Sequence, residues 1–203
     1  MYRTLTYNFA QRAAGLAATG TRADLIYAAL EVRMGVEARL QSYVQANDEV
    51  SSALKKGWQI PKLFKGLEKT FSNSSQVVEF VTSVPGVEPV KMHFIPVSSR
   101  LRGHAERFGN ALHLTAHSHS SERWWADLKL SVDEAVRDLE VCAQATLLGV
   151  PLRDPRTGHV LTTFEFHNDD PRLELMQRLA ESKAPHNFMV TYLSTEGYYA
   201  SAR

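Results

Sequence analysis

The chain has 203 residues, a formal net charge of +1 and 44% hydrophobic residues. A nearly neutral chain has no overall attraction to nucleic acid or to acidic membranes, so any contact with nucleic acid needs a local basic patch. The single cysteine, Cys142, excludes a disulfide within the chain, and the first twenty residues contain no apolar run long enough for a signal peptide or a membrane span. We therefore expect a cytoplasmic protein that does not enter a membrane, built mainly as one domain.

Two helices are predicted at the start of the chain. Residues 2–18 predict the first, because apolar side chains recur there at helical spacing, namely Leu5, Phe9, Ala13 and Leu16. Thr21 and Asp24 have the spacing of a capping box, which predicts a second, long helix that ends near Gln45.

The second helix carries two charges on its predicted inward stripe. The stripe consists of Ile26, Leu30, Arg33, Glu37, Leu40 and Val44. Burial of either charge alone is costly, so we expect Arg33 and Glu37 to pair at i, i+4, or to meet partners on the later helix at residues 99–116. The alternative is that the helix is rolled and the pair reaches solvent.

Turn residues and caps divide the middle of the chain. Turn signals at Gly57 and Pro61 precede a short helix over residues 61–70, and the SNSS run that follows predicts a loop or a helix cap. The VKMHFI run predicts a short strand. Ser98 or Ser99 then caps a helix whose apolar face contains Leu101, Ala105, Phe108, Leu112 and Thr115.

The last third of the chain mixes helices and strands. Ser131 and Glu134 predict the capping box of a further helix, which Gly149 and Pro151 end. Alternation over residues 160–166 predicts a strand, followed by a short helix at 170–183 and a strand at 187–194. We therefore expect a mainly α fold, with a helical domain over residues 1–150 and a strand–helix–strand extension over residues 151–203 packed on it.

Three histidines, His113, His117 and His119, lie within seven residues of one another. His113 and His117 share one helix face, as two zinc ligands could. No fourth ligand stands at a recognisable spacing, and the chain has no cysteine pair and no H-E-x-x-H sequence, so we predict no metal site. A solvated polar helix end is the plainer interpretation.

Acid–base chemistry on RNA is a further interpretation of this segment. Arg107 and His113 have the form R-x5-H, with Asn110 midway between them. Cleavage of RNA without metal needs a group that takes the proton of the ribose 2′-hydroxyl and a cation that stabilises the phosphate. Histidine titrates near neutral pH, and arginine binds phosphate through a planar fork. Arg107, Asn110 and His113 are therefore the candidate catalytic residues.

Three stretches resemble the HEPN-like superfamily, in its uncharacterised bacterial members. The stretch LIYAALEVRMGVEARL, with Arg33 and Glu37 four residues apart, is similar to the long second helix of these proteins. GWQIPKLFKGLEKTF and RFGNALHL look like later parts of the same domain, so the resemblance covers roughly residues 1–150.

The resemblance implies an all-α bundle that forms a homodimer. In active members an R-x4-6-H motif from each protomer lines a shared cleft and cuts RNA without metal, often in toxin–antitoxin or phage-defence systems. It thus implies that Arg33, Glu37 and His117 are accessory residues and that no cofactor is needed. The alternative function is a non-catalytic helical adaptor that binds a protein partner, such as an antitoxin or a subunit of a defence complex.

Overall fold

The chain is described from a computed structural model. The described residues are 6–48, 50–70, 75–111, 121–150, 152–153, 160–166 and 169–202. The described helices are α1 (Thr6–Thr19), α2 (Arg22–Gln45), α3 (Ser52–Lys55), α4 (Ile60–Thr70), α5 (Ser99–Ala111), α6 (Glu122–Ala143), α7 (Arg172–Glu181) and α8 (Thr195–Ser201). The described strands are β1 (Val77–Ser83), β2 (Val90–Phe94), β3 (Leu152–Arg153), β4 (Val160–Leu161) and β5 (Asn187–Leu193).

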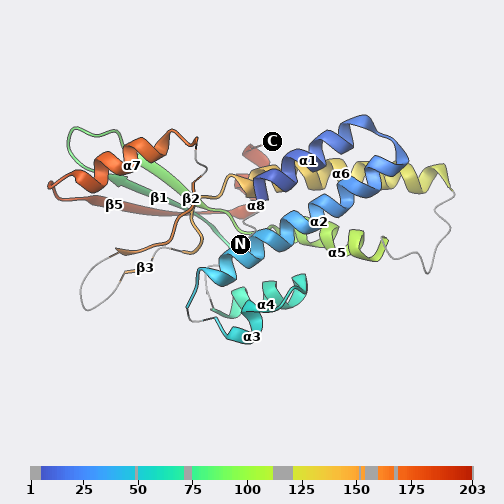
Figure 1. The fold of residues 1–203 in the computed structure, drawn as a ribbon, viewed down its shortest axis with the longest axis horizontal. Coiled ribbons are helices and arrows are strands. Elements are labelled where there is room, and N and C mark those ends of the chain that lie inside the picture. The colour runs from blue at the N-terminus through green and yellow to red at the C-terminus, as the bar shows by residue number, and fades with distance from the viewer. Residues whose placement is uncertain are drawn as a thin grey trace.

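The fold is mostly helical, with a small antiparallel sheet, as the sequence predicts at this coarse level. Figure 1 shows a helical bundle at one end of the molecule and the sheet with α7 at the other. Among the described residues, no helix combines the length and the apolar character that crossing a membrane requires.

Helix α2 is the centre of the bundle and packs against α1, α4, α5 and α6. Its buried face contains small residues, among them Ala28, Ala29 and Gly35. At Gly35, an added Cβ would lie 2.7 Å from Leu139 Cδ2 and 3.0 Å from Phe9 Cβ. Small side chains therefore allow α1 and α6 to approach the backbone of α2 closely.

The buried stripe of α2 differs from the predicted one. Leu30 is exposed, and Arg33 and Glu37 are half-buried at the side of the stripe. The charged residue that is buried in α2 is instead Arg39. The predicted stripe was thus right at Leu40 and Val44 and wrong in its middle, because α2 has neighbours on several sides and is buried over more than one stripe. The expected contact with the helix at residues 99–116 is confirmed for Arg33, which donates to the carbonyl of Ala105.

Capping side chains begin the helices, though not always where the sequence predicts. Thr21 accepts a hydrogen bond from the Asp24 amide, and Ser98 accepts one from the Leu101 amide, so both predicted caps are confirmed. The predicted start of the next helix at Ser131 was wrong, because α6 begins nine residues earlier with Ser121 as its cap. Ser131 is buried within that helix.

The sheet has the order β2-β1-β5, and both pairings are antiparallel. The sequence analysis missed β1, whose Phe80 lies opposite Met92 of β2 and Val190 of β5. The sheet thus joins residues on both sides of the boundary expected near residue 150. The strand predicted at 160–166 was wrong beyond β4, apart from a single bridge between Leu147 and Phe164.

Two buried tyrosines connect the bundle to the segment that leaves the sheet. The Tyr43 hydroxyl of α2 donates to the carbonyl of Ile95 at 2.6 Å. The Tyr199 hydroxyl of α8 donates to the carbonyl of Pro96 at 2.8 Å. Because both tyrosines are almost fully buried, these bonds fix where the sheet meets the bundle.

We expect Gly35→Ala to lower the free energy of unfolding by about 1–3 kcal/mol, because the new methyl group would overlap Leu139 and Phe9. The matched control is Gly15→Ala in α1, where nothing lies within 4 Å of an added Cβ. That variant should gain up to about 1 kcal/mol from helix propensity. Urea unfolding of both variants measures the difference, and equal effects would contradict the close packing of α2.

Candidate functional site

The predicted catalytic residues lie at the end of α5, as far as they are described. Arg107 and Asn110 are exposed, and Phe108 between them is fully buried in the core. His113 and the accessory His117 lie outside the described residues, as does His119. The structure therefore places two of the three predicted catalytic side chains on the solvent side of one helix.

The Arg107 guanidinium is held in place by two neighbours. Its Nη1 donates to Ser131 Oγ at 3.2 Å, and its Nη2 lies 3.4 Å from Nδ1 of His104. Within the part of the chain that the structure describes, no carboxylate forms an ion pair with Arg107. Arg107 is thus an oriented cation whose charge is not neutralised by a described acidic side chain.

His104 is a buried histidine that the sequence analysis did not single out. Its side chain is 4% exposed, and its ring stacks on Phe108 with 5.9 Å between ring centroids. Its Nε2 lies 3.4 Å from the carboxylate of Glu134 without an aligned hydrogen bond. Burial, and next the charge of Arg107, lower the pKa of His104. A neutral His104 can accept from Arg107 at Nδ1 and so helps to orient it.

An ion pair next to this site fixes α5 on α6. Arg100 binds Asp138 through two hydrogen bonds of 2.9 and 2.5 Å, and Asp138 is fully buried. Such a two-point contact defines both distance and orientation. It explains why Ser131 and Glu134 are inside a helix: they face α5 together with Asp138 and do not form a cap.

A small hollow adjoins Arg107 between α5 and α6. Its volume is about 110 Å³, and its lining consists of Arg107, Phe108, Trp124, Asp127, Leu128 and Ser131. The Trp124 ring meets the Trp125 ring edge to face, with 4.8 Å between centroids. Aromatic rings beside an arginine suit a ligand with a planar ring, which packs on the aromatic side chains, and an attached anionic group, which binds the arginine.

The accessory pair lies on a different side of α5. Arg33 donates to the carbonyl of Ala105 at 3.3 Å, and its guanidinium occupies the space beside Gly109. Burial raises the pKa of the Glu37 carboxyl, and the charge of Arg33 opposes this shift. Positions 105 and 109 lie about half a turn from position 107, so the structure does not bring Arg33 and Arg107 together.

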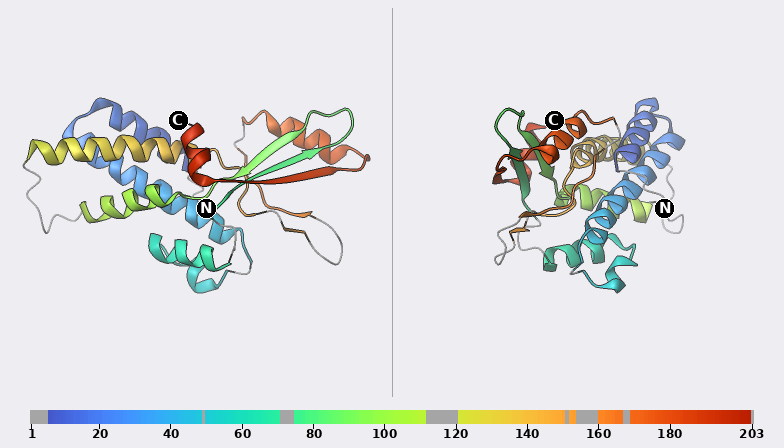
Figure 2. Two further views of the ribbon diagram at one scale, coloured as in Figure 1. Left: turned by 180° about the vertical axis from the view of Figure 1, so that it is seen from behind. Right: turned by 60° about the vertical axis from the view of Figure 1, so that its left-hand side comes forward.

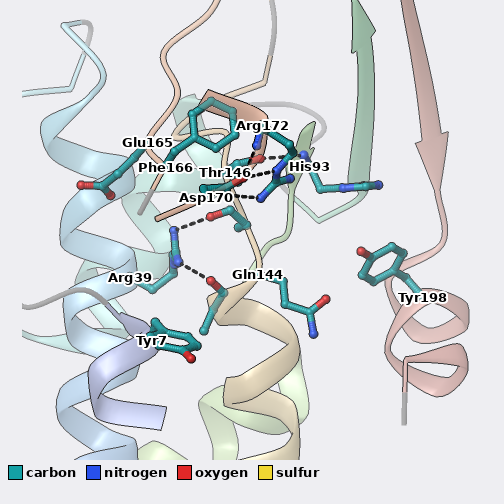
Figure 3. A pocket seen from close by; sticks show the side chains of 12 residues that line it. Tyr7, Arg39, His93, Gln144, Thr146, Glu165, Phe166, Asp170, Arg172 and Tyr198 are labelled. Carbon is teal, nitrogen blue, oxygen red and sulfur yellow. Dashed lines mark hydrogen bonds and ion pairs between the residues drawn. The ribbon is translucent and has the colours of Figure 1, made fainter. Parts of the chain in front are cut away.

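A larger cavity, which the sequence analysis missed, lies where the bundle meets the sheet. Its volume is about 410 Å³. Figure 3 shows side chains of α1, α2, β2 and α8 around it, with the end of α6, residues 165–166 and the start of α7. The polar and aromatic members are Tyr7, Arg39, His93, Gln144, Thr146, Glu165, Phe166, Asp170, Arg172 and Tyr198. We call it the junction cavity.

Two polar groups on one side of the junction cavity are satisfied by neighbours. Arg172 binds the carboxylate of Asp170 at 2.9 and 2.6 Å and donates to the carbonyl of Lys91 at 3.2 Å. His93 lies 3.3 Å from the carboxylate of Glu79, its partner across the sheet. Burial lowers the pKa of His93, and the hydrogen bond and charge of Glu79 oppose that shift.

Comparisons of the chain with protein-family models, with curated proteins and with solved structures find no match. Among the described residues, no group of three or more histidine, cysteine, aspartate or glutamate side chains is placed to hold a metal ion. The candidate sites therefore rest on the geometry of α5 and of the junction cavity.

We expect His104 to make stability depend on pH. Its folded pKa is below the ordinary value near 6.5, so the unfolded chain binds the proton first as pH falls. The stabilising contribution is complete above about pH 6.5 and declines as pH falls toward the lowered pKa. The loss of unfolding free energy between about pH 7.5 and about pH 5.5 should be smaller in His104→Gln than in the unchanged chain.

The control for this experiment is Phe108→Leu, which changes the ring that stacks on His104 but adds no titrating group. It should lower stability similarly at both pH values, as followed by urea midpoints. If His104→Gln keeps the full pH dependence, His104 is not the source.

Proposed function

We propose that the chain is a HEPN-like protein of a bacterial toxin–antitoxin or phage-defence system that cleaves RNA without metal. The observation that carries the proposal is Arg107, which is exposed and oriented by Ser131 and His104. A phosphate-binding arginine needs both properties. An exposed guanidinium can be reached by the phosphate, and an oriented guanidinium loses less conformational entropy on binding. The packing of α1, α2, α5 and α6 into a helical bundle supports the part of this proposal that concerns the fold.

The proposed reaction uses three residues of one segment. His113 takes the proton of the ribose 2′-hydroxyl, and the 2′-oxygen attacks the adjacent phosphorus. The bond from phosphorus to the 5′-oxygen breaks, and the 5′-oxygen takes up a proton from water, which leaves a cyclic 2′,3′-phosphate and a 5′-hydroxyl end. Arg107 stabilises the charge on the phosphate, and Asn110 orients the phosphate or His113.

The hollow beside Arg107 supports RNA as the substrate. Trp124 lines this hollow together with Arg107. Aromatic side chains stack on nucleobases largely independently of the base sequence. The proposal includes a homodimer in which two α5 helices lie near the two-fold axis and share one cleft. His117 is then an accessory residue, and no metal takes part.

Purified protein incubated with total RNA tests this proposal. Arg107→Gln and His113→Ala should each lower the cleavage rate by at least about 100-fold, the usual scale for positioned acid–base or charge assistance. Arg107→Lys should not restore the rate, because lysine lacks the fork. His117→Ala and His119→Ala should change it only a few fold, and a chelator should have no effect.

Three results would contradict the proposal. These are cleavage that stops on chelation, equal losses at all three histidines, and absence of cleavage of any RNA. Arg102→Gln serves as the matched control, since Arg102 is on the same helix and pairs with Glu106 at i, i+4. Its loss should leave the rate unchanged.

One observation favours the adaptor function as a second candidate. Strand β5 is at the edge of the sheet, and no other described strand pairs with its outer side. Its exposed large apolar side chains are Phe188, Met189, Val190 and Tyr192. Figure 2 shows the sheet from behind, with β5 along its free edge. An apolar edge strand without charges is a template for pairing with a strand of another protein.

Replacement of Met189 and Tyr192 by lysine tests this second function. Affinity capture from cells that express the chain should recover a stable partner, and the double variant should lose it because charged side chains disfavour strand addition at an edge. The control is Trp58→Lys, which adds charge at an equally exposed apolar residue outside the sheet. Loss of the partner in the control alone would place the interface elsewhere.

A further inference from the structure

Arg39 is the one buried arginine that the structure describes, and its guanidinium is incompletely satisfied. The residue is 5% exposed. Its Nη1 and Nη2 donate to the carbonyls of Ala145 and Ala143 over long distances, 3.5 and 3.4 Å. Its Nε has no hydrogen-bond partner among the described residues. Figure 3 shows these contacts at the wall of the junction cavity.

The two carbonyls compensate only part of the charge. Ala143 is the last residue of α6, where unpaired carbonyls carry partial negative charge, and Ala145 lies two residues beyond the helix. In the described part of the chain, no carboxylate lies within ion-pair distance of Arg39. Buried charges in proteins are normally paired, because an unpaired one is costly to remove from water. The Tyr43 ring also faces the guanidinium, with 5.5 Å from Arg39 Cζ to the ring centroid, but a neutral ring is not an anion. The described residues therefore leave the Arg39 charge without an anionic partner.

The acidic side chains of the cavity are occupied elsewhere. Asp170 is bound by Arg172, and Glu165 has an interaction of its own. Neither carboxylate reaches Arg39 within 4.0 Å. The cation of the cavity without a carboxylate partner among the described residues is Arg39. Its Nε is itself buried, so a ligand in the cavity meets the guanidinium at the Nη atoms, in place of the long contacts to the two carbonyls.

The rest of the cavity suits the body of a small molecule. Its volume of about 410 Å³ lies in the range of ligand pockets. The aromatic rings of Tyr7, Phe166 and Tyr198 line it, and Gln144 adds an amide. Figure 3 shows that Tyr7 and Tyr198 come from different elements, α1 and α8. Rings with a few polar groups bind an apolar body and fix its orientation.

We propose that the junction cavity binds a small organic anion, with the Arg39 fork on its carboxylate or phosphate group. This site is separate from the α5 site and does not depend on RNA cleavage. The cavity is assembled from several elements and exists only in the folded chain, so a ligand in it stabilises that state, and the stabilisation grows with the logarithm of ligand concentration above the Kd.

Thermal unfolding of the full chain with benzoate or with inorganic phosphate tests the site, against sodium chloride at equal ionic strength. The melting temperature should rise with the concentration of at least one probe. A response to benzoate alone identifies a carboxylate on an apolar body, and a response to phosphate alone identifies a phosphate group. Absence of a rise with both probes would overturn the proposal.

Arg39→Met removes the fork while it keeps a long apolar stem, and it should weaken the apparent affinity for the probe at least about tenfold. The matched control is Arg33→Met, on the same helix and also bonded to a backbone carbonyl, but outside the cavity. It should keep the full response. An equal response in both variants would show non-specific binding and overturn the proposal.

A spectroscopic measurement on the unchanged chain covers the case in which Arg39→Met does not fold. The Arg39 Nε–H resonance, assigned by its absence in Arg39→Lys or by backbone-linked experiments, should shift when the probe is added. A resonance that stays in place at probe concentrations that raise the melting temperature would place binding elsewhere. Cleavage of RNA is not a readout here, so failure of either proposal leaves the other intact.

Discussion

The close packing of α2 is the constraint on which the rest of the fold depends. Helices α1, α3, α4, α5 and α6 contact it, and Gly35 leaves no room for a methyl group between Phe9 and Leu139. A helix surrounded in this way can place a long charged side chain only where a neighbouring helix ends or leaves space. Arg33 reaches the gap beside Gly109 of α5, and Arg39 reaches the last carbonyls of α6. Both arginines thus occupy positions that the packing of α2 determines.

Local signals in the sequence predicted most helices and two strands of the sheet, β2 and β5, but not β1. Thr21 and Ser98 act on amides three residues away, so their caps could be recognised without knowledge of the fold. Ser131 and Glu134 have the same spacing but face α5 next to the Arg100–Asp138 pair, a contact that no local pattern reveals. Strand β1 was missed although its run VVEFVTS is rich in β-branched residues and pairs with the nearby β2. Its second pairing, with β5 more than one hundred residues away, leaves no trace in the spacing of residues.

The two candidate sites also differ in how far the local sequence could predict them. Arg107 and Asn110 belong to one short segment, so their exposure on α5 followed from the buried positions Leu101, Ala105 and Phe108. The junction cavity is assembled from six separate segments, and none of them carries a motif of its own. Only Arg39 gave a local signal, as a charge at helical spacing between the buried Val36 and Tyr43. That signal was missed because the predicted stripe passed through Arg33 and Glu37.

Helix α6 relates the two sites to each other. Its middle holds α5 through Asp138 and Ser131, and its last carbonyls hold Arg39. Ser131 and Ala143 are twelve residues apart, or about 18 Å along a helix axis, so a ligand in the junction cavity cannot touch Arg107. An anion on Arg39 competes with the carbonyls of Ala143 and Ala145 for the same fork. An effect of the anion on the α5 site must therefore pass through a helix that contacts both, either α6 through Ser131 and Arg107 or α2 through Arg33 and Ala105.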